Sequence, residues 1–419
     1  MVYVLNNNGE PLMPTNRHGK VRHLLKKGLA KVIRKEPFTI KLLYNSTNFT
    51  QDLTLGVDTG SGTFATAVST NKGEIVYLSE VAVRNDVADK MTQRRKYRRN
   101  RRNRKTRYRK VRFLNRKNSK KTNRFSPTMI SKLHSHIKEI EFIKSILPIK
   151  TLVFETGTFD THLMKNPTMN RHWGYQKGPN YGFENTKAMI LNRDNYTCQH
   201  CKGKHKDSKL EVHHIVFRSK GGSDEQDNLI TLCKTCHDNL HKGKIKLKLK
   251  GKLKGTLKFA TQMNSIRIQL FKYYPEAIET FGFITKANRQ ELNLPKEHYF
   301  DASVIASAGN PITFKTNIVF LKKSISKGDY QRTKGVRSEI TMPKSKVNGF
   351  KKFDKVKYKN NIYFIKGRYS TGYVILMDIE GNKQSFTNPK IPKMCNLTRI
   401  TARKSTLTQP KLLNIYTQL

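Results

Sequence analysis

The first fifty residues combine the two-residue period of strands with the longer period of a helix. Residues 1–6 (MVYVLN) and 38–44 (FTIKLLY) read as strands, and a turn follows the first of them. Residues 17–33 read as a basic amphipathic helix that Pro37 ends. The apolar positions with helical spacing in this segment are Val21, Leu24, Leu25 and Leu29. The pattern predicts a small β-helix-β unit with one basic face.

Residues 53–83 read as three apolar strands joined by turns that contain Gly and polar residues, which predicts an antiparallel meander. Asp58 lies in the otherwise apolar first strand. A buried carboxylate is costly there unless it is paired or binds a cation. The alternative is that Asp58 caps the following turn, which contains Gly60 and Gly62.

A second candidate carboxylate follows an ordinary helix. Residues 126–147 begin with Ser126 as N-cap and Pro127 at the first helical position, and Pro148 stops the helix. The apolar stripe, predicted as core, is Ile130, Leu133, Ile137, Ile140, Phe142 and Ile143. The next strand, TLVFE, ends on Glu155, which is either a surface residue or a ligand. Two carboxylates that each end a hydrophobic strand favour paired metal ligands.

The third candidate carboxylate is Asp301. His298 and Asp301 are three residues apart in KEHYFDASVIASA, so both face one side at the start of a predicted helix. An H-x-x-D pair is weak evidence by itself. Its position after Asp58 and Glu155 in the chain strengthens it.

Beyond residue 312 the chain alternates apolar and polar positions between Gly and Asn turns, which predicts a small basic β-barrel. A generic SH3-like module is one interpretation. The charge favours contact with RNA or DNA.

Two connecting stretches are less regular. Residues 161–195 read as a linker followed by a short helix, and the rings of Trp173, Tyr175 and Tyr181 would either stack on bases or pack on the protein. Residues 243–260 alternate Lys with apolar residues and could form a hairpin or a linker.

The chain has 419 residues and a formal net charge of +52. This length predicts about two to four domains. The charge predicts a polyanionic partner, because self-repulsion opposes a compact state. No long apolar run or signal peptide is evident in the sequence, so we expect no membrane partner and a cytoplasmic location, in the prokaryotic cytosol or nucleoid.

Residues 90–124 are the most basic stretch, with Lys or Arg at 19 of 35 positions and no acidic residue. Such a block is often a disordered tail. This one is internal and rich in Arg, which predicts a long helix that grips phosphates. The arginines expected to bind nucleic acid are Arg94, Arg95, Arg98, Arg99, Arg101, Arg102, Arg104, Arg107, Arg109 and Arg112.

Four of the five cysteines form two C-x-x-C pairs: Cys198, Cys201, Cys233 and Cys236. This spacing predicts a structural Zn²⁺ site, because four thiolates satisfy its tetrahedral geometry. Two disulfides are the alternative, but only Cys395 lies outside the set and a reduced intracellular setting fits.

Polar residues between and beside these pairs carry chemistry suited to phosphodiester hydrolysis, which needs an activated water and a cation. They are His213, His214, Asn228 and His237. This set resembles the HNH nucleases and their ββα-metal motif. The resemblance implies that His214 is the general base, that His213 and His237 hold one Mg²⁺, and that Asn228 orients the base. A zinc knuckle that only binds nucleic acid is the alternative.

The rest of the chain resembles IscB-type, transposon-associated proteins, which are relatives of CRISPR type II effectors. EPLMPT near the N-terminus is similar to their PLMP segment. The stretches around Asp58, Glu155 and His298–Asp301 resemble RuvC segments I, II and III, and the Arg-rich block resembles the bridge helix. The resemblance implies that Asp58, Glu155 and Asp301 hold two Mg²⁺ ions and that His298 helps activate water.

We therefore expect an α/β multidomain protein: an RNase H-like (RuvC) core split in three segments, an Arg-rich bridge helix, an inserted ββα-metal HNH domain with a Cys₄ zinc site, and a small basic β-rich C-terminal domain. The expected domains are 1–50 (PLMP), 51–88 (RuvC segment I), 89–125 (bridge helix), 126–183 (RuvC segment II and linker), 184–243 (HNH), 244–312 (RuvC segment III) and 313–419 (a C-terminal domain binding RNA and the target-adjacent motif).

The resemblance implies an RNA-guided double-strand DNA endonuclease that forms a monomeric ribonucleoprotein with a long omega RNA. The HNH site would cut the guide-paired strand and the RuvC site the displaced strand. The alternative is a stand-alone HNH homing or restriction-type endonuclease that binds duplex DNA directly.

Overall fold

The computed structural model describes residues 1–105, 125–165, 167, 169, 172–178, 180–247, 257–326 and 346–413. The chain divides into two compact units. The main unit comprises 1–157 with 262–419, and the inserted unit comprises 158–261. In the described residues, no helix combines the length and the apolar character that crossing a membrane requires.

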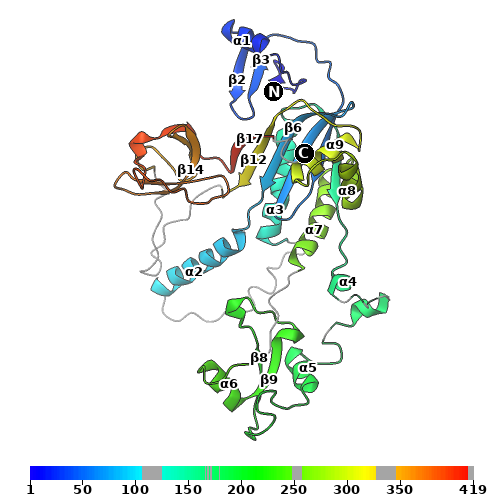
Figure 1. Cartoon of the computed structure of the whole chain (residues 1–419), viewed down its shortest axis with the longest axis vertical. Helices are drawn as coiled ribbons and strands as arrows, with labels where there is room; N and C mark the ends of the chain where they lie inside the picture. The colour runs from blue at the N-terminus through cyan, green and yellow to red at the C-terminus, as the bar shows by residue number, and fades with distance from the viewer. Residues whose placement is uncertain are drawn as a thin grey trace. The chain divides into compact units, whose positions relative to one another are not determined.

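A small sheet with the order β1-β3-β2 and one helix form the N-terminal part of the main unit (Figure 1). Its elements are β1 (Tyr3–Leu5), α1 (His18–Lys26), β2 (Ala30–Arg34) and β3 (Thr39–Leu42). The helix predicted over 17–33 is therefore too long. It ends before Gly28, whose φ of +70° is a helix-ending conformation, and Leu29 lies beyond it. The strand β2 then pairs antiparallel with β3.

The main sheet contains eight described strands in the order β10-β7-β4-β5-β6-β12-β17, and β11 also pairs with β6. Their bounds are β4 (Leu53–Asp58), β5 (Thr63–Thr70), β6 (Glu74–Ala82), β7 (Ile149–Thr156), β10 (Ile278–Phe281), β11 (Thr313–Phe314), β12 (Ile318–Ser324) and β17 (Thr406–Leu412). The predicted antiparallel meander is confirmed as β4, β5 and β6. Strand β7 pairs parallel with β4, and β10 pairs parallel with β7.

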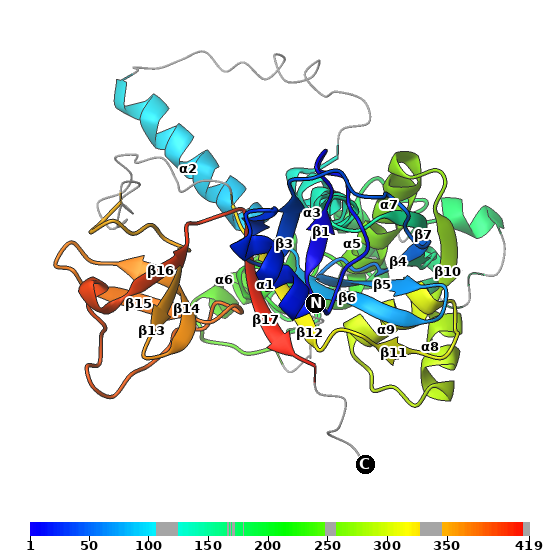
Figure 2. The ribbon, with the colours of Figure 1, turned by 90° about the horizontal axis from the view of Figure 1, so that it is seen from above.

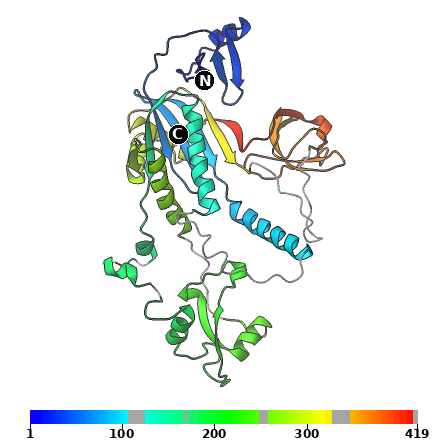
Figure 3. The same ribbon diagram turned by 180° about the vertical axis from the view of Figure 1, so that it is seen from behind.

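Helices cover both faces of this sheet (Figure 2). They are α3 (Pro127–Lys144), α7 (Lys258–Tyr273), α8 (Gly282–Glu291) and α9 (His298–Ser307). Successive side chains of β4 (LTLGVD) point to opposite faces of the sheet. Leu55 and Val57 join the core that includes side chains of α3 and α7, which lie side by side in Figure 3. Gly56 meets α9 on the other face, where a Cβ would lie 2.4 Å from the nitrogen of Ala306.

Helix α3 begins as predicted, with the Ser126 side chain accepting a hydrogen bond from the Met129 amide. Its buried face also carries Lys132, His136 and Glu139, which the apolar stripe did not predict. Their partners explain this burial. Glu139, for example, forms an ion pair of 2.5 Å with the buried Lys322 of β12. The apolar Ile130 of the predicted stripe is instead 39% exposed.

A separate sheet with the order β15-β14-β13-β16 lies in the C-terminal region. Its elements are β13 (Lys355–Tyr358), β14 (Asn361–Arg368), β15 (Val374–Met377), the short η5 (Met394–Asn396) and β16 (Thr398–Thr401). The expected domain at 313–419 is not one structural piece, because β12 and β17 belong to the main sheet. Alternating periodicity predicts a strand but not the sheet that it joins.

The basic stretch begins with α2 (Val87–Lys105), so its described part is helical as predicted. Residues 106–124 lie outside the described residues, and so do the expected ligands Arg107, Arg109 and Arg112.

In the residues that the structure describes, the inserted unit contains an antiparallel hairpin between helices. Its elements are α4 (Thr161–Lys165), η2 (His172–Gln176), α5 (Thr186–Arg193), β8 (Leu210–His214), η3 (Arg218–Lys220), η4 (Gln226–Asn228), β9 (Leu229–Cys233) and α6 (Lys234–His241). The unit is wider than the expected HNH domain at 184–243. Most of the stretch left open as hairpin or linker, 248–256, lies outside the described residues.

Candidate functional site

Strand register brings two of the predicted carboxylates together in the main unit. Asp58 ends β4 directly opposite Glu155 of β7. Residues opposite each other in a sheet present their side chains on the same face. Helix α9 covers this face of the sheet (Figure 2). Gly56, two residues before Asp58, packs directly against α9, so both carboxylates lie on the side of the third predicted element.

The first turn of α9 supplies the other two predicted residues. His298 Nδ1 lies 2.7 Å from Asp58 Oδ2, and this bond raises the pKa of His298 to about 9. Asp301 lies one turn later, where burial and then the charge of Asp58 raise its pKa. Arg289 of α8 forms an ion pair of 2.8 Å with Asp301. The structure therefore gathers all four predicted residues at one place.

The surroundings of Glu155 disfavour the ionised form of its carboxyl group. Burial raises its pKa to about 7, and the charges of Asp58 and Asp301 contribute in the same direction. Its Oε2 atom is buried and has no hydrogen-bond partner in the described residues. Crowded carboxylates with an unsatisfied oxygen suit a divalent cation, which prefers oxygen ligands and would offset their repulsion. The residues present therefore fit Mg²⁺.

Three residues near this group were not predicted from the sequence. Glu80 of β6 lies opposite Ala65, which itself lies opposite Asp58, so Glu80 belongs to the same row. Burial raises the pKa of Glu80. Arg289 and Thr285 come from α8, and the Thr285 side chain donates a hydrogen bond to Glu155. The alternation of β6 could have indicated Glu80, whereas only tertiary packing brings α8 here.

The inserted unit carries a second cluster, of histidines. His213 of β8 meets His237 and His241 of α6, and their ring nitrogens lie within 4.8 Å of one another. His213 Nε2 lies 3.3 Å from His241 Nε2. Burial, and then the two neighbouring imidazoles, lower the pKa of His213 to about 4. Imidazole nitrogens gathered this closely suit a divalent metal ion.

His241 was missed as a member of this cluster. It lies four residues after His237 in one helix, a spacing that places both rings on one face and could have indicated it. The structure thus supplies three imidazoles where two were expected.

The expected base, His214, has a carboxylate partner. Its Nε2 lies 2.8 Å from Asp224 Oδ1, which also accepts a hydrogen bond of 2.7 Å from Arg218. Asn228, expected to orient the base, instead holds the loop between β8 and β9. Its amide nitrogen donates to the carbonyls of Val216 and Ser223, and its oxygen accepts the Val216 amide. Asp224 therefore contacts His214, and Asn228 shapes the loop that carries Asp224.

The two C-x-x-C pairs converge as predicted. Cys198, Cys201, Cys233 and Cys236 are buried, and their sulfurs lie within 4.8 Å of one another. The sulfurs of Cys201 and Cys233 are 3.7 Å apart. Zn–S bonds of about 2.3 Å in a tetrahedron require S–S edges of about 3.8 Å, whereas a disulfide requires about 2.0 Å. The four thiols therefore fit Zn²⁺ and not two disulfides.

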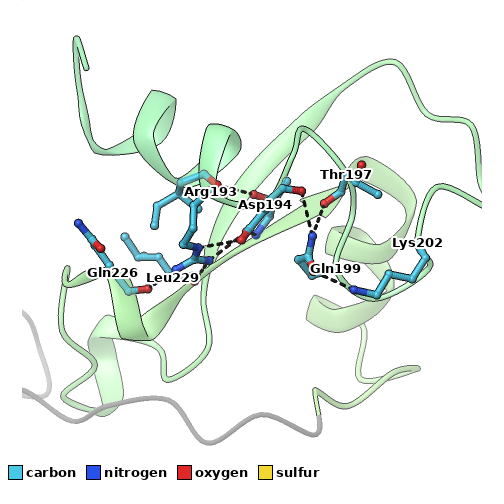
Figure 4. A network of polar contacts seen from close by, with 9 residues as sticks. Arg193, Asp194, Thr197, Gln199, Lys202, Gln226 and Leu229 are labelled. Atoms are coloured by element: carbon cyan, nitrogen blue, oxygen red, sulfur yellow. Dashed lines mark hydrogen bonds and ion pairs between the residues drawn. The ribbon is translucent and has the colours of Figure 1, made fainter. Parts of the chain in front are cut away.

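A network of hydrogen bonds connects α5 to the hairpin and to the first cysteine pair (Figure 4). Arg193 donates to both oxygens of Asp194 and to the carbonyls of Gln226 and Leu229. Asp194 in turn accepts the Thr231 amide at 2.9 Å. Gln199, between Cys198 and Cys201, donates to the carbonyls of Asp194 and Thr197 and accepts a bond from Lys202. These hydrogen bonds position the first cysteine pair against β9.

The described part of the basic helix presents its predicted arginines to solvent. Arg94, Arg95, Arg98 and Arg99 are exposed on α2. The helix also includes Arg101, Arg102 and Arg104, whose side chains lie outside the described residues. Four exposed guanidinium groups on one helix suit a phosphate backbone.

Of the three aromatic residues of the linker, two can be placed. Tyr175 packs on His162 and donates a hydrogen bond to Asp160, so it contacts the protein. Tyr181 is 63% exposed. The side chain of Trp173 lies outside those that the structure describes.

Two protein families match the chain. The family described as RRXRR protein matches residues 2–178, and the family described as HNH endonuclease matches residues 198–243. The second match contains both the histidine cluster and the four cysteines.

Two relatives of known description are similar to parts of the chain. Anaredoxin from Nostoc sp. (strain PCC 7120) is 36% identical over 72 residues, which cover 17% of this chain and 91% of that protein. The Type IV methyl-directed restriction enzyme EcoKMcrA from Escherichia coli (strain K12) is 40% identical over 65 residues. That match covers 14% of this chain and 23% of the restriction enzyme, so the chain spans about a quarter of that relative's length.

The RRXRR family is typical of proteins related to IscB, and here its match is followed by an HNH endonuclease domain with a four-cysteine cluster. The chain therefore belongs to the IscB-type family of nucleases and is a metal-dependent DNA endonuclease.

Proposed function

We propose that this protein is an RNA-guided double-strand DNA endonuclease with two cleavage centres. The observation that carries the proposal is the convergence of Asp58, Glu155, His298 and Asp301 in the main unit, apart in the chain from the HNH residues. A stand-alone HNH enzyme needs only one centre. Two centres of different composition suit a duplex whose two strands have been separated and are cut independently.

The first centre would be a RuvC site that cuts the displaced strand. Asp58, Glu155 and Asp301 would hold two Mg²⁺ ions, which supply charge stabilisation for the scissile phosphate. His298 is held by Asp58 at 2.7 Å and would help to activate the attacking water. Arg289 neutralises part of the negative charge beside Asp301. The split RuvC core is supported by β4, β7 and α9, which come from the three segments expected at 51–88, 126–183 and 244–312.

The second centre would be the HNH site, which cuts the guide-paired strand. His213 and His237, with His241 as a third ligand, would hold one divalent metal ion that offsets charge on the phosphate. Three imidazole nitrogens suit a transition-metal ion better than the expected Mg²⁺, which prefers oxygen ligands. His214 would accept the proton of the attacking water, and its bond to Asp224 fixes the ring and stabilises the proton that it gains. Zn²⁺ bound by the four cysteines would stabilise the fold of this domain, because a domain of this size has only a small hydrophobic core.

The guide would be a long omega RNA in a monomeric ribonucleoprotein. Pairing with the guide reads the target, while the protein holds the heteroduplex through its backbone. The net charge of +52 and the exposed arginines of α2 support such a partner. The PLMP domain at 1–50, the bridge helix at 89–125 and the C-terminal sheet, which lies within 313–419, would contact RNA or DNA around the two nuclease centres.

The decisive experiment is to purify the protein, sequence the RNA that co-purifies with it, and test cleavage before and after RNase. We expect a long RNA with a variable guide segment, and the loss of site-specific cutting once it is digested. Site-specific cutting that survives RNase would overturn RNA guidance.

The second candidate is an HNH endonuclease that binds duplex DNA directly, which the similarity to a restriction enzyme favours. That enzyme would need the histidine centre alone, so Asp58→Asn would leave both of its cuts unchanged. Under the proposed function the same substitution leaves a nick in one strand.

A further inference from the structure

An exposed pair of aromatic rings lies where β10 passes into α8. The side chain of Phe283 is 73% exposed and that of Phe281 is 37% exposed. The two rings are nearly parallel, with 7° between their planes and 6.2 Å between their centroids. Ile284, which follows them, is 39% exposed. An uncovered apolar group of this kind, beside a polar site, is typical of a binding surface.

The segment that carries these rings is fastened to Glu155. Gly282 lies between the two phenylalanines, and a Cβ there would lie 3.0 Å from Glu155 Oε1. Thr285 is buried, and its side chain bonds to Glu155. The strand beneath is paired as well, because Thr280 lies opposite Glu155 in the β10–β7 register. The backbone segment that carries the rings therefore lies against the carboxylate site.

The chemistry around the rings indicates what covers them. Lys286 follows Phe283 by three residues on α8 and is exposed, so a cation lies on the same side of the helix as the ring. An aromatic face beside a cation accommodates a nucleobase and its phosphate, and every base offers a face for stacking. Bases in a duplex are already stacked on one another. An unpaired strand is therefore the nucleic acid that can use these rings.

We propose that Phe281 and Phe283 form a stacking platform for unpaired bases of the DNA strand that is cut at the Asp58–Glu155–Asp301 centre, with Lys286 contacting a phosphate. This inference rests on the proposed function, because it assigns a substrate strand to that centre. The platform holds a single strand at a constant distance from the carboxylates. It thereby favours an unpaired strand over a duplex and sets the position of the cut.

The first test measures stacking without cleavage. A single-stranded oligodeoxynucleotide that contains 2-aminopurine is titrated with His214→Ala protein in Ca²⁺, and fluorescence reports base stacking. The His214→Ala protein is the parent in this test, and the substitutions that follow are added to it. We expect the parent to quench the fluorescence strongly. Phe283→Ala should lose the quenching and bind at least about fivefold more weakly, the scale of one lost base–aromatic contact. Phe283→Trp should restore both. Phe49→Ala, at a phenylalanine that is 92% exposed in the main unit, is the matched control and should behave like the parent.

The second test measures cleavage of each strand of a guided duplex in Mg²⁺. We expect Phe283→Ala in the otherwise native chain to slow or shift the cut in the displaced strand and to leave the cut in the guide-paired strand unchanged. Behaviour identical to Phe49→Ala in both tests would overturn the platform. An equal loss of both cuts would also overturn it, because the rings would then serve as a docking surface for protein.

Failure of the proposed function has a different signature. If Asp58→Asn leaves both cuts intact, the carboxylate centre is not a nuclease site, whatever the rings do. If Asp58→Asn removes one cut while Phe283→Ala changes neither cut nor fluorescence, only the platform is wrong. Melting temperatures of the Phe283 variants within a few degrees of the parent establish that the fold is intact.

Discussion

Asp58 and Glu155 lie directly opposite each other in the parallel pairing of β4 and β7, although they are far apart in the sequence. Their carboxylates share the face beneath α9, and the pKa of Glu155 is raised to about 7. Two carboxylates that oppose each other's ionisation are stable together when a cation lies between them. Strand register, which sheet formation specifies strongly, thus creates the acidic centre.

Asp58→Asn should convert the enzyme into a nickase. The substitution keeps the size of the side chain but removes the charge that a cation and His298 require, so cleavage of one strand should fall by at least about a hundredfold. Gels with each strand labelled separately would measure this. Asp52→Asn is the control, because Asp52 is exposed and pairs with Lys150 on the surface. Continued cutting of both strands would contradict the assignment.

His241→Ala should weaken the histidine centre through its metal. Removing one of three imidazoles should raise the divalent-ion concentration needed for half-maximal cutting of the guide-paired strand by at least about tenfold. His172→Ala, at an exposed histidine of the same unit, should leave the requirement unchanged. Titration of Mn²⁺ against the rate for each strand would measure the effect. A loss at every metal concentration would instead indicate a folding defect.

Cys233→Ser should unfold the inserted unit and spare the main unit. It removes one of four thiolates from the predicted zinc site, on which the small hairpin depends. We expect loss of one zinc per chain, rapid proteolysis within 158–261, and cutting of only one strand. Cys395→Ser is the matched control, since Cys395 is exposed and lies in the C-terminal region. Equal zinc content in both variants would show that the cysteines do not hold it.

Gly56→Ala should displace α9. A Cβ at Gly56 would lie 2.4 Å from the Ala306 nitrogen and 2.6 Å from the Ala302 oxygen, both backbone atoms that cannot rotate away. We expect a stability loss of about 1–3 kcal/mol, seen as a lower melting temperature, together with a slower cut at the Asp58 centre. A Cβ at Gly62 would have no atom within 4 Å, so Gly62→Ala should change neither the melting temperature nor the rate of this cut. Normal activity in Gly56→Ala would mean that α9 does not position His298 and Asp301.

The main unit should lose stability in mild acid because of His136. Its ring is buried, stacks on Phe64 with 4.0 Å between centroids, and has a pKa lowered to about 4 by burial. Since the folded pKa lies below the unfolded value of about 6.5, the unfolded chain binds the proton first as pH falls. Stability should therefore fall between pH 6.5 and 4 by up to about 1.4 kcal/mol per pH unit.

The measurement is the melting temperature of the main unit as a function of pH. His136→Leu should melt with a shallower dependence on pH in this window, even if it is less stable at neutral pH. His134→Leu, two residues away and exposed, should keep the native dependence. Identical slopes in all three proteins would contradict the assignment to His136.

The candidate residues were largely visible in the sequence because their patterns are local. A carboxylate that ends an apolar strand marks Asp58 and Glu155, and two C-x-x-C pairs mark the zinc ligands. The helix N-cap at Ser126 and the meander of β4–β6 follow from short-range periodicity and turn chemistry. Each of these features depends on residues that lie a few positions apart, so it can be recognised from the sequence alone.

Partners from distant parts of the chain depend on packing and were not predicted. Asp224 contacts His214, the expected base, because the loop between β8 and β9 folds back on this histidine. Arg289 reaches Asp301 only once α8 packs beside α9. Strands β12 and β17 join the main sheet although their alternation equally suits the separate C-terminal sheet.

The sequence by itself thus determined which side chains are available for chemistry and which elements carry them. The tertiary structure decided which of those side chains meet, because strand register and helix packing are set by the burial of whole faces. Asp58 opposite Glu155, and Gly282 and Thr285 beside Glu155, are consequences of that burial and not of any local pattern.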